Sequence, residues 1–177
     1  MNQFINEIIE CYDVNYGSIS VNLIVFNREL IKYCEMNSCG NYGRNYMCPP
    51  FIGETESNIA KIKQYNNAIV FQKVYQLEDS YDYDGMMDGQ KQFKEIVQKI
   101  KEKAEIRFDD SFILGVGGCK LCSSCAVQKS MPCRYPQKAV SSLESYCIDV
   151  SQLAGVCNLN YINGLNIVTY FGTLFLK

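Results

Sequence analysis

Four cysteines in the second half of the sequence are spaced for holding a metal cluster. Cys119, Cys122 and Cys125 recur at every third position, and Cys133 follows eight residues later with Pro136 behind it. This spacing lets one loop place three thiolates around three corners of an iron–sulfur cube. A tetrahedral zinc site usually takes two sulfurs from one such turn, so the third cysteine would be surplus. We therefore expect an iron–sulfur cluster, with zinc and with disulfides or free thiols as the alternatives.

The charges around these cysteines agree with an anionic cluster. Between Cys119 and Val140 the sequence has basic residues and no acid. The basic residues are Lys120, Lys129, Arg134 and Lys138. A cluster with its thiolates is a net anion, so nearby cations and free backbone N–H groups stabilise it. The local charge thus favours a cluster over a purely structural turn.

A second group of cysteines, Cys34, Cys39 and Cys48, comes earlier in the chain. Asn, Gly and Tyr fill the gaps without an apolar period, so we expect an ordered loop. Cys48 is followed by Pro49, like the Cys-Pro pair of ferredoxin cluster motifs. The segment predicts further thiolate ligands, with three thiols lining a tight turn as the alternative. Arg44, its one cation, either balances a cluster, holds an anionic substrate or is simply solvated.

The remaining three cysteines are expected to pack as small apolar side chains. Cys11 falls at the end of a predicted helix over residues 3–11, and Cys147 and Cys157 stand among apolar residues. A free cysteine behaves as a small hydrophobe, so burial is the simpler expectation for each of them. None of the three is a candidate ligand on this reading.

The composition limits the classes of function. The chain has 177 residues, 47% of them apolar, and a net charge of −2, as expected for one globular domain. The small net charge argues against nucleic acid or a membrane as partner. The N-terminal residues lack the features of a signal peptide, so we expect a cytoplasmic protein with reduced cysteines. The absence of histidine excludes His-ligated metals and a Cys–His dyad.

Alternating helical and strand patterns predict the α/β (α+β) class, with a small mixed sheet flanked by helices in a single domain. Strands are expected over residues 19–26, 68–77, 112–116 and 167–176, and helices over residues 3–11, from residue 55 and over residues 87–106. The segment from 68 to 116 has the length of a βαβ crossover. The cysteine-rich loops would then be residues 34–50 and 117–136, with the second leaving the carboxyl end of a strand.

Two finer expectations concern the helices. The lysines of the helix over residues 87–106, Lys94 among them, are expected to face water. Ser141-x-x-Glu144 has the pattern of a capping box, and Asp149-x-x-Gln152 looks like a second N-terminal cap. No pair of carboxylates has a recognisable acid–base spacing, so the sequence names no catalytic residue.

The two cysteine-rich motifs together resemble a known family. The motifs are Cys39-x-x-Tyr42-Gly43 to Cys48-Pro49-Pro50, and Gly118-Cys119-x-Leu121-Cys122-x-x-Cys125 to Cys133-Arg134-x-Pro136, followed by Ser142-Leu143-Glu144 and Ile148-Asp149-Val150. They are similar to those of the cysteine-rich predicted metal-binding proteins of domain-of-unknown-function family 2284, over most of the chain. The resemblance implies an iron–sulfur protein like those of anaerobic bacteria and archaea, and no established reaction. The family's cysteines fall on Cys34, Cys39, Cys48, Cys119, Cys122, Cys125 and Cys133. A glycine is more frequent in the family where Cys147 stands.

Seven ligands exceed the four thiolates of one [4Fe-4S] cluster. In one arrangement Cys119, Cys122, Cys125 and Cys133 hold a first cluster, and the earlier three cysteines hold a second with one open iron. In the other arrangement Cys133 joins the earlier three, as in two-cluster ferredoxins, and the open iron lies on the Cys119–Cys125 cluster. A single cluster shielded by the first loop is a third arrangement.

Three functions follow from these ligands. The first is an iron–sulfur protein that passes electrons to a redox partner protein or reacts with a small-molecule substrate. The second is a zinc-stabilised interaction module without catalysis. The third is a cysteine-based carrier of sulfur or metal. An open iron would suit sulfur transfer, dehydration or substrate reduction, because it acts as a Lewis acid.

Overall fold

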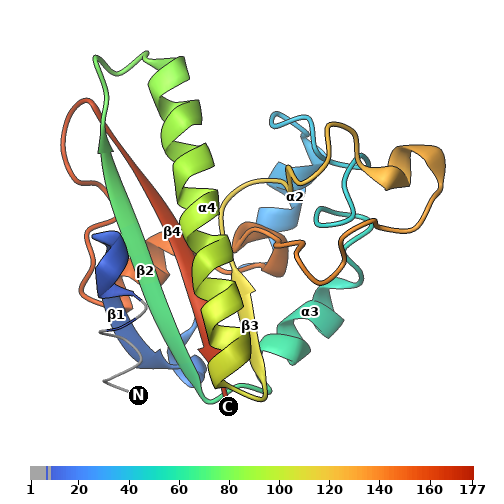
Figure 1. Ribbon diagram of the computed structural model, residues 1–177, viewed down its shortest axis with the longest axis horizontal. Helices are drawn as coiled ribbons and strands as arrows, with labels where there is room; N and C mark the ends of the chain where they lie inside the picture. Colours follow the sequence, from blue (N-terminus) through green and yellow to red (C-terminus); the bar gives the residue numbers. More distant parts are fainter. Residues whose placement is uncertain (1–6, 8) are drawn as a thin grey trace.

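A four-stranded antiparallel sheet forms the centre of the molecule (Figure 1). The computed structural model describes residue 7 and residues 9–177, so the helix expected over residues 3–11 lies largely outside the described part. The strands are β1 (Asn15–Ser20), β2 (Asn67–Gln76), β3 (Ser111–Leu114) and β4 (Ile167–Leu176). Their order across the sheet is β1-β2-β4-β3, and every neighbouring pair is antiparallel rather than mixed. The expected mixed α/β class is confirmed.

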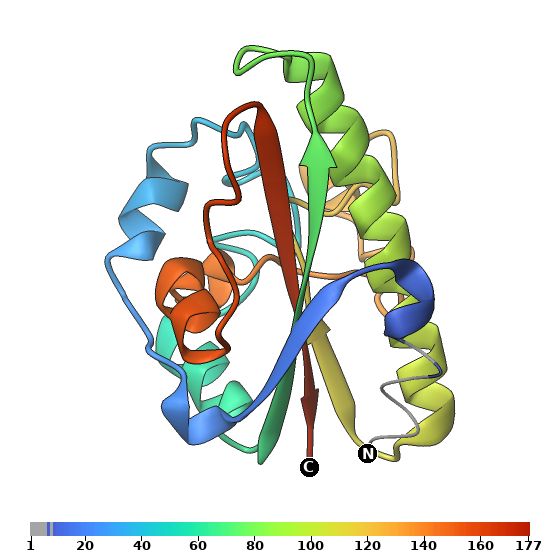
Figure 2. The same ribbon diagram turned by 90° about the vertical axis from the view of Figure 1, so that its left-hand side faces the viewer.

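Both faces of the sheet are buried, which gives the molecule three layers (Figure 2). Successive side chains of a strand point to opposite faces, and β2 is apolar on both of them. Ile69 and Phe71 pack against α4 (Tyr83–Arg107), whereas Ala68 and Val70 pack on the side of α3 (Thr55–Ile62) and α5 (Val150–Val156). This explains why β2 reads as a continuous apolar run instead of an alternating one.

The long helix α4 covers one face of the sheet with a single apolar stripe. Its buried residues are Gly89, Phe93, Val97, Ile100 and Ala104. They recur at three- and four-residue spacing, so they share one side of the helix. Among the described residues, no helix combines the length and the apolar character needed to cross a membrane.

The β2–α4–β3 segment confirms the expected crossover, with one difference. β2 and β3 each pair antiparallel with β4, so they run parallel to one another with β4 between them. This is a split βαβ unit, in which the connection spans an inserted strand. The chain enters the second cysteine-rich loop directly after β3, at the carboxyl end of that strand, as predicted.

The strand expected over residues 19–26 is wrong. Strand β1 covers Asn15–Ser20, and a 3-10 turn over Val21–Leu23 follows it. Gly17 lies within β1, where a Cβ would come 2.8 Å from the carbonyl oxygen of Cys157. The glycine therefore reflects close packing and not a change of chain direction.

One of the two predicted helix caps forms. The Asp149 carboxylate accepts hydrogen bonds from the backbone N–H groups of Ser151 (3.0 Å) and Gln152 (3.2 Å), and so caps α5. The expected capping box at Ser141 and Glu144 is wrong. Glu144–Tyr146 is a single 3-10 turn, in which the Ser142 hydroxyl accepts from the Ser145 amide instead.

Candidate metal centre

The second cysteine-rich loop is closed at its base by the strand from which it leaves. The Gly115 amide donates to the Ser141 carbonyl (2.9 Å), and the Gly115 carbonyl accepts from the Leu143 amide (3.2 Å). These two bonds hold together the ends of residues 116–140, which contain four of the candidate ligands. The sheet thus fixes the loop at both ends, although the loop itself contains only a short 3-10 turn, Ala126–Lys129.

The four cysteines of this loop surround one small cavity. Its wall includes Cys119, Cys122, Cys125 and Cys133, and all four are partly exposed free thiols. Arg134 lies in the same wall and donates from Nη1 to the Ser124 carbonyl (3.0 Å). The structure therefore brings the four predicted ligands of this loop together, with a cation beside them.

The three earlier cysteines lie on and after helix α2 (Leu30–Glu35). Cys34 lies in the last turn of α2, whereas Cys39 and Cys48 lie in residues 36–50, which form an irregular loop as expected. Cys39 is exposed, and Cys34 and Cys48 are partly buried. The three thiols are close enough to affect each other's protonation, because Cys39 and Cys34 both raise the pKa of Cys48.

The two cysteine-rich loops pack against each other. The Asn45 side chain, which is 5% exposed, donates from Nδ2 to the Cys119 carbonyl (2.8 Å). Tyr46 donates from its hydroxyl to the Met131 carbonyl (2.9 Å). Since each bond joins a side chain of the first loop to the backbone of the second, the two loops form one unit beside α4 (Figure 1).

Burial holds several of these thiols in the neutral form. Burial, and then the neighbouring Cys39, Cys34 and Cys119 thiolates, raise the pKa of Cys48 to about 12. Burial also raises the pKa of Cys119, which its neighbouring cysteines raise further and a hydrogen bond from the Leu121 amide lowers. A metal binds the thiolate, so it would have to displace these protons on binding.

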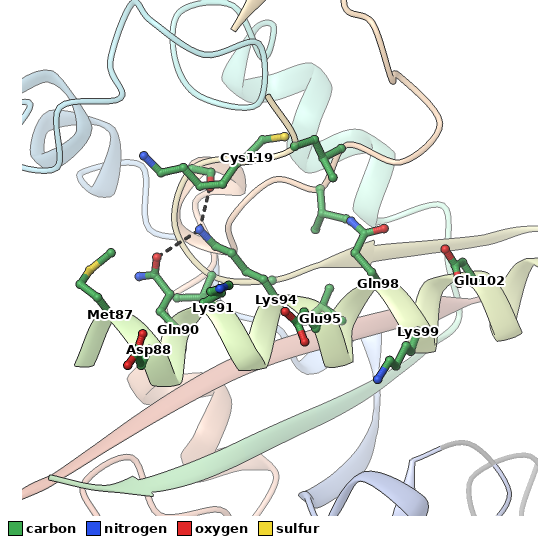
Figure 3. A pocket seen from close by; sticks show the side chains of 17 residues that line it. Met87, Asp88, Gln90, Lys91, Lys94, Glu95, Gln98, Lys99, Glu102 and Cys119 are labelled. Atoms are coloured by element: carbon green, nitrogen blue, oxygen red, sulfur yellow. Dashed lines mark hydrogen bonds between the residues drawn. The ribbon is translucent and has the colours of Figure 1, made fainter. Parts of the chain in front are cut away.

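Lys94 reaches the junction of the two loops, contrary to the expectation that it faces water. It leaves α4 toward the second loop and donates from Nζ to the Gly118 carbonyl (2.8 Å) and to Gln90 Oε1 (3.1 Å), as Figure 3 shows. Burial lowers the pKa of Lys94, and the nearby Lys120 lowers it further, whereas Cys119 and Cys48 raise it. The helix places a cation there because its side next to the buried stripe faces the loop that follows β3.

Two further residues, Glu144 and Cys147, lie near Cys34 of the first group of cysteines. Burial raises the pKa of the Glu144 carboxyl, and both Glu144 and Cys147 raise the pKa of Cys34, so all three groups are neighbours. Cys147 is 0% exposed, and its carbonyl accepts from the Asn27 amide (2.7 Å) just before α2. Its φ of 60° is a conformation that glycine adopts most readily. This agrees with the glycine expected at this position in the family.

The other cysteines divide between surface and core. Cys157 is 8% exposed and belongs to the core beside α5, and Cys147 is fully buried, as predicted for both. The expectation that Cys11 is buried is wrong, because it lies on the exposed turn Glu10–Tyr12 with Lys103 Nζ 3.7 Å from its sulfur.

No disulfide joins any of the ten cysteines, all of which lie in the described part of the chain, so none competes for the candidate ligands. Within residue 7 and residues 9–177, no three Cys, Asp or Glu side chains are arranged to hold a single metal ion. The ligand set Cys34, Cys39, Cys48, Cys119, Cys122, Cys125 and Cys133 therefore stays a prediction, supported by the grouping of the seven thiols in two adjoining loops.

Comparison with known proteins agrees with this arrangement of thiols. A family model described as predicted metal-binding protein (DUF2284) matches residues 17–176. The chain belongs to this DUF2284 family. The match extends from β1 to the end of β4, so it includes the sheet and both cysteine-rich loops. No curated protein matches the chain. No solved structure matches it either.

Sequence reasoning did not single out Lys94, Asn45 and Glu144 of this DUF2284 protein. Lys94 has the same helical spacing as the solvated lysines around it, and only the path of the following loop distinguishes it. Asn45 stood in a segment already rich in Asn, and Glu144 was assigned to a helix cap. One signal was available in the sequence. The second loop contains no acid, which suits an anionic centre, and such a centre is stabilised by neighbouring cations.

Proposed function

We propose that this DUF2284 protein binds iron–sulfur clusters through its two cysteine-rich loops. The observation that supports this most is the shared cavity of Cys119, Cys122, Cys125 and Cys133. Four sulfur donors beside a cation, with no acid in the loop, suit an anionic cluster better than a free divalent ion. DUF2284 membership supports the coarser part of the proposal, which is metal binding.

The position of Cys133 favours one of the two ligand arrangements. Cys133 lines the same cavity as the three closely spaced cysteines, and it also raises the pKa of Cys119. We therefore assign these four residues to a first [4Fe-4S] cluster. Cys34, Cys39 and Cys48 would hold a second cluster and leave one iron for another ligand. Glu144 and Cys147 are neighbours of Cys34 and are candidates for that position.

The chain's own groups would hold and shield the first centre. Asn45 fixes the Cys119 backbone, the Leu121 amide donates to the Cys119 sulfur, and Lys94 adds a positive charge beside both loops. Hydrogen bonds and cations near the sulfurs favour the reduced state, because reduction adds negative charge. When bound, the clusters would supply electron storage for transfer to a redox partner protein or to a small-molecule substrate. We place this activity in the cytoplasm, where the cysteines stay reduced.

The test is the iron and acid-labile sulfide content of the full chain, purified without air, together with electron paramagnetic resonance after reduction. Two clusters predict about eight irons and eight sulfides per chain, and the single shielded cluster predicts about four. A colourless protein with stoichiometric zinc would overturn the proposal in favour of an interaction module. Persulfide on Cys34, Cys39 or Cys48 without iron would overturn it in favour of a sulfur carrier.

A further inference from the structure

A large cavity lies between α4 and the beginning of the second cysteine-rich loop (Figure 3). Its volume is about 810 Å³, within the range of pockets that hold small molecules. One wall is the side of α4 next to its buried stripe, and the other is the backbone from Gly115 to Leu121. Cys119 is part of this wall, so the cavity and the candidate cluster share a residue.

The cavity has an apolar body and a cationic part. Val97, Val116, Val140 and Leu121 provide apolar walls, together with the stems of longer side chains. Two lysines, Lys94 of α4 and Lys120 next to Cys119, also line the cavity and give it this cationic part.

The acids that line the cavity do not neutralise this pair of lysines. Asp88, Glu95 and Glu102 are exposed residues of α4, and Figure 3 shows Asp88 and Glu95 pointing away from the loop that Lys94 meets. Two hydrogen-bond acceptors of Lys94, the Gly118 carbonyl and Gln90 Oε1, are both neutral.

We propose that this cavity binds a small organic anion, with its apolar part between α4 and Val116 and its anionic group on Lys94 and Lys120. Two ammonium groups in the wall of an apolar cavity can bind one carboxylate, sulfonate or phosphate group through charge-assisted hydrogen bonds. The anion site itself does not depend on the proposed function. Only one consequence rests on it, which is that a bound anion would lie beside Cys119 and thus beside the first cluster.

Anilinonaphthalene sulfonate is the test probe, because it joins an apolar aromatic body to one anionic group. Its neutral analogue phenylnaphthylamine has the same body without the charge. Dye fluorescence is titrated with the full chain purified without air. We expect saturable binding of the sulfonate, and about tenfold weaker binding to Lys120→Met. The neutral analogue should bind both proteins equally, since it cannot use the ammonium group.

Two matched variants separate this site from general attraction. Lys129→Met removes an exposed lysine of the same loop that does not line the cavity, and it should leave sulfonate binding unchanged. Val116→Trp fills the cavity without changing charge, and it should abolish binding of both dyes. Equal losses in Lys120→Met and Lys129→Met would overturn the proposal, as would unchanged binding to Val116→Trp. Circular dichroism of each variant identifies misfolding, and Lys94→Met supplies a second charge deletion if Lys120→Met misfolds.

The outcome is independent of the metal assignment. Iron, zinc and sulfide are measured in the same samples that receive the dye. Selective sulfonate binding to a protein that holds zinc would keep the anion site and remove the iron–sulfur proposal. Full iron content with no selectivity between the two dyes would keep the iron–sulfur proposal and remove the anion site.

Discussion

Lys94 Nζ lies 2.8 Å from the Gly118 carbonyl oxygen, and this hydrogen bond joins α4 to the first residues of the cysteine-rich loop. The bond connects the rigid layer of the fold to the segment that carries Cys119. The helix contacts the sheet mainly through its apolar stripe, and Tyr170 of β4 also donates from its hydroxyl to the Met86 carbonyl (2.6 Å). Near the end of the loop, Gln98 donates from Nε2 to the Lys138 carbonyl (2.7 Å), so Lys94 and Gln98 together fix the loop relative to the helix.

Lys94→Met should lower the free energy of unfolding by about 1–3 kcal/mol, because the Gly118 carbonyl loses its donor in a partly buried position. Urea unfolding of the protein purified without air measures the change. Lys91→Met is the control, since Lys91 is an exposed lysine of the same helix and its replacement should cost no more than about 0.5 kcal/mol. Similar losses in both variants would show that the bond to Gly118 contributes nothing specific.

Cys122→Ser should lower the iron content and the stability together, because ligation energy is folding energy in a loop with little secondary structure. Iron analysis and thermal unfolding of the same sample measure both effects. Cys11→Ser is the matched control, since Cys11 lies on the exposed turn outside both loops. We expect it to keep its full metal content. If Cys122→Ser is as coloured and as stable as the unchanged protein, Cys122 is not a ligand.

Gly172→Ala should destabilise the protein by about 1–3 kcal/mol through overpacking of the core. A Cβ at Gly172 would lie 2.6 Å from Cζ of Phe71, which is 0% exposed and has no room to move. Gly155→Ala is the opposite case, because a Cβ at this exposed position in the last turn of α5 would meet nothing within 4 Å. That variant should be about 0.5–1 kcal/mol more stable, since alanine restricts the unfolded chain and favours helix. Denaturant midpoints of the two variants should move in opposite directions.

Asp149→Ala should cost about 0.5–2 kcal/mol at neutral pH, because α5 loses its N-terminal cap. The bond from Ser151 is the largest of the hydrogen bonds that lower the pKa of Asp149. A lowered pKa in the folded state gives stability that is present above the unfolded value of about 3.9 and lost as the pH falls through the folded value. The difference between the two proteins should thus shrink on acidification from pH 7 toward pH 3, as unfolding by urea measures it. Asp109→Ala, which removes an exposed acid without a capping role, should change the free energy of unfolding at pH 7 by no more than about 0.5 kcal/mol.

The sequence was sufficient for elements whose signal is local. The period of Phe93, Val97 and Ile100 predicted α4, and the β-branched and aromatic runs predicted β2 and β4, because burial on the sheet imposes those periods. The crossover followed from the lengths of these elements. The predicted position of strand β1 was wrong. The need for glycine at position 17 arises only from close packing against Cys157, which is distant in the sequence.

The candidate metal centre, like the fold, was predictable only where its signal is local in the sequence. The spacing of Cys119, Cys122 and Cys125 is a local signal, and the structure places these thiols around one cavity with Cys133. The approach of Cys48 to Cys119 depends on how two loops pack, which no spacing within either loop encodes. Lys94 was misplaced for the same reason, because helical periodicity defines the side chains facing the sheet but not those facing a later loop.

The contact between Asn45 and the Cys119 carbonyl joins residues 74 positions apart. A ribosome adding 5–20 residues per second needs about 4–15 s to proceed from the first loop to the second. During this interval the earlier thiols have been made and the later ones have not. Newly synthesised chains would therefore pass through a stage at which three of the seven candidate sulfur donors are open to oxidants, and maturation in an oxygen-free cell would spare them that damage.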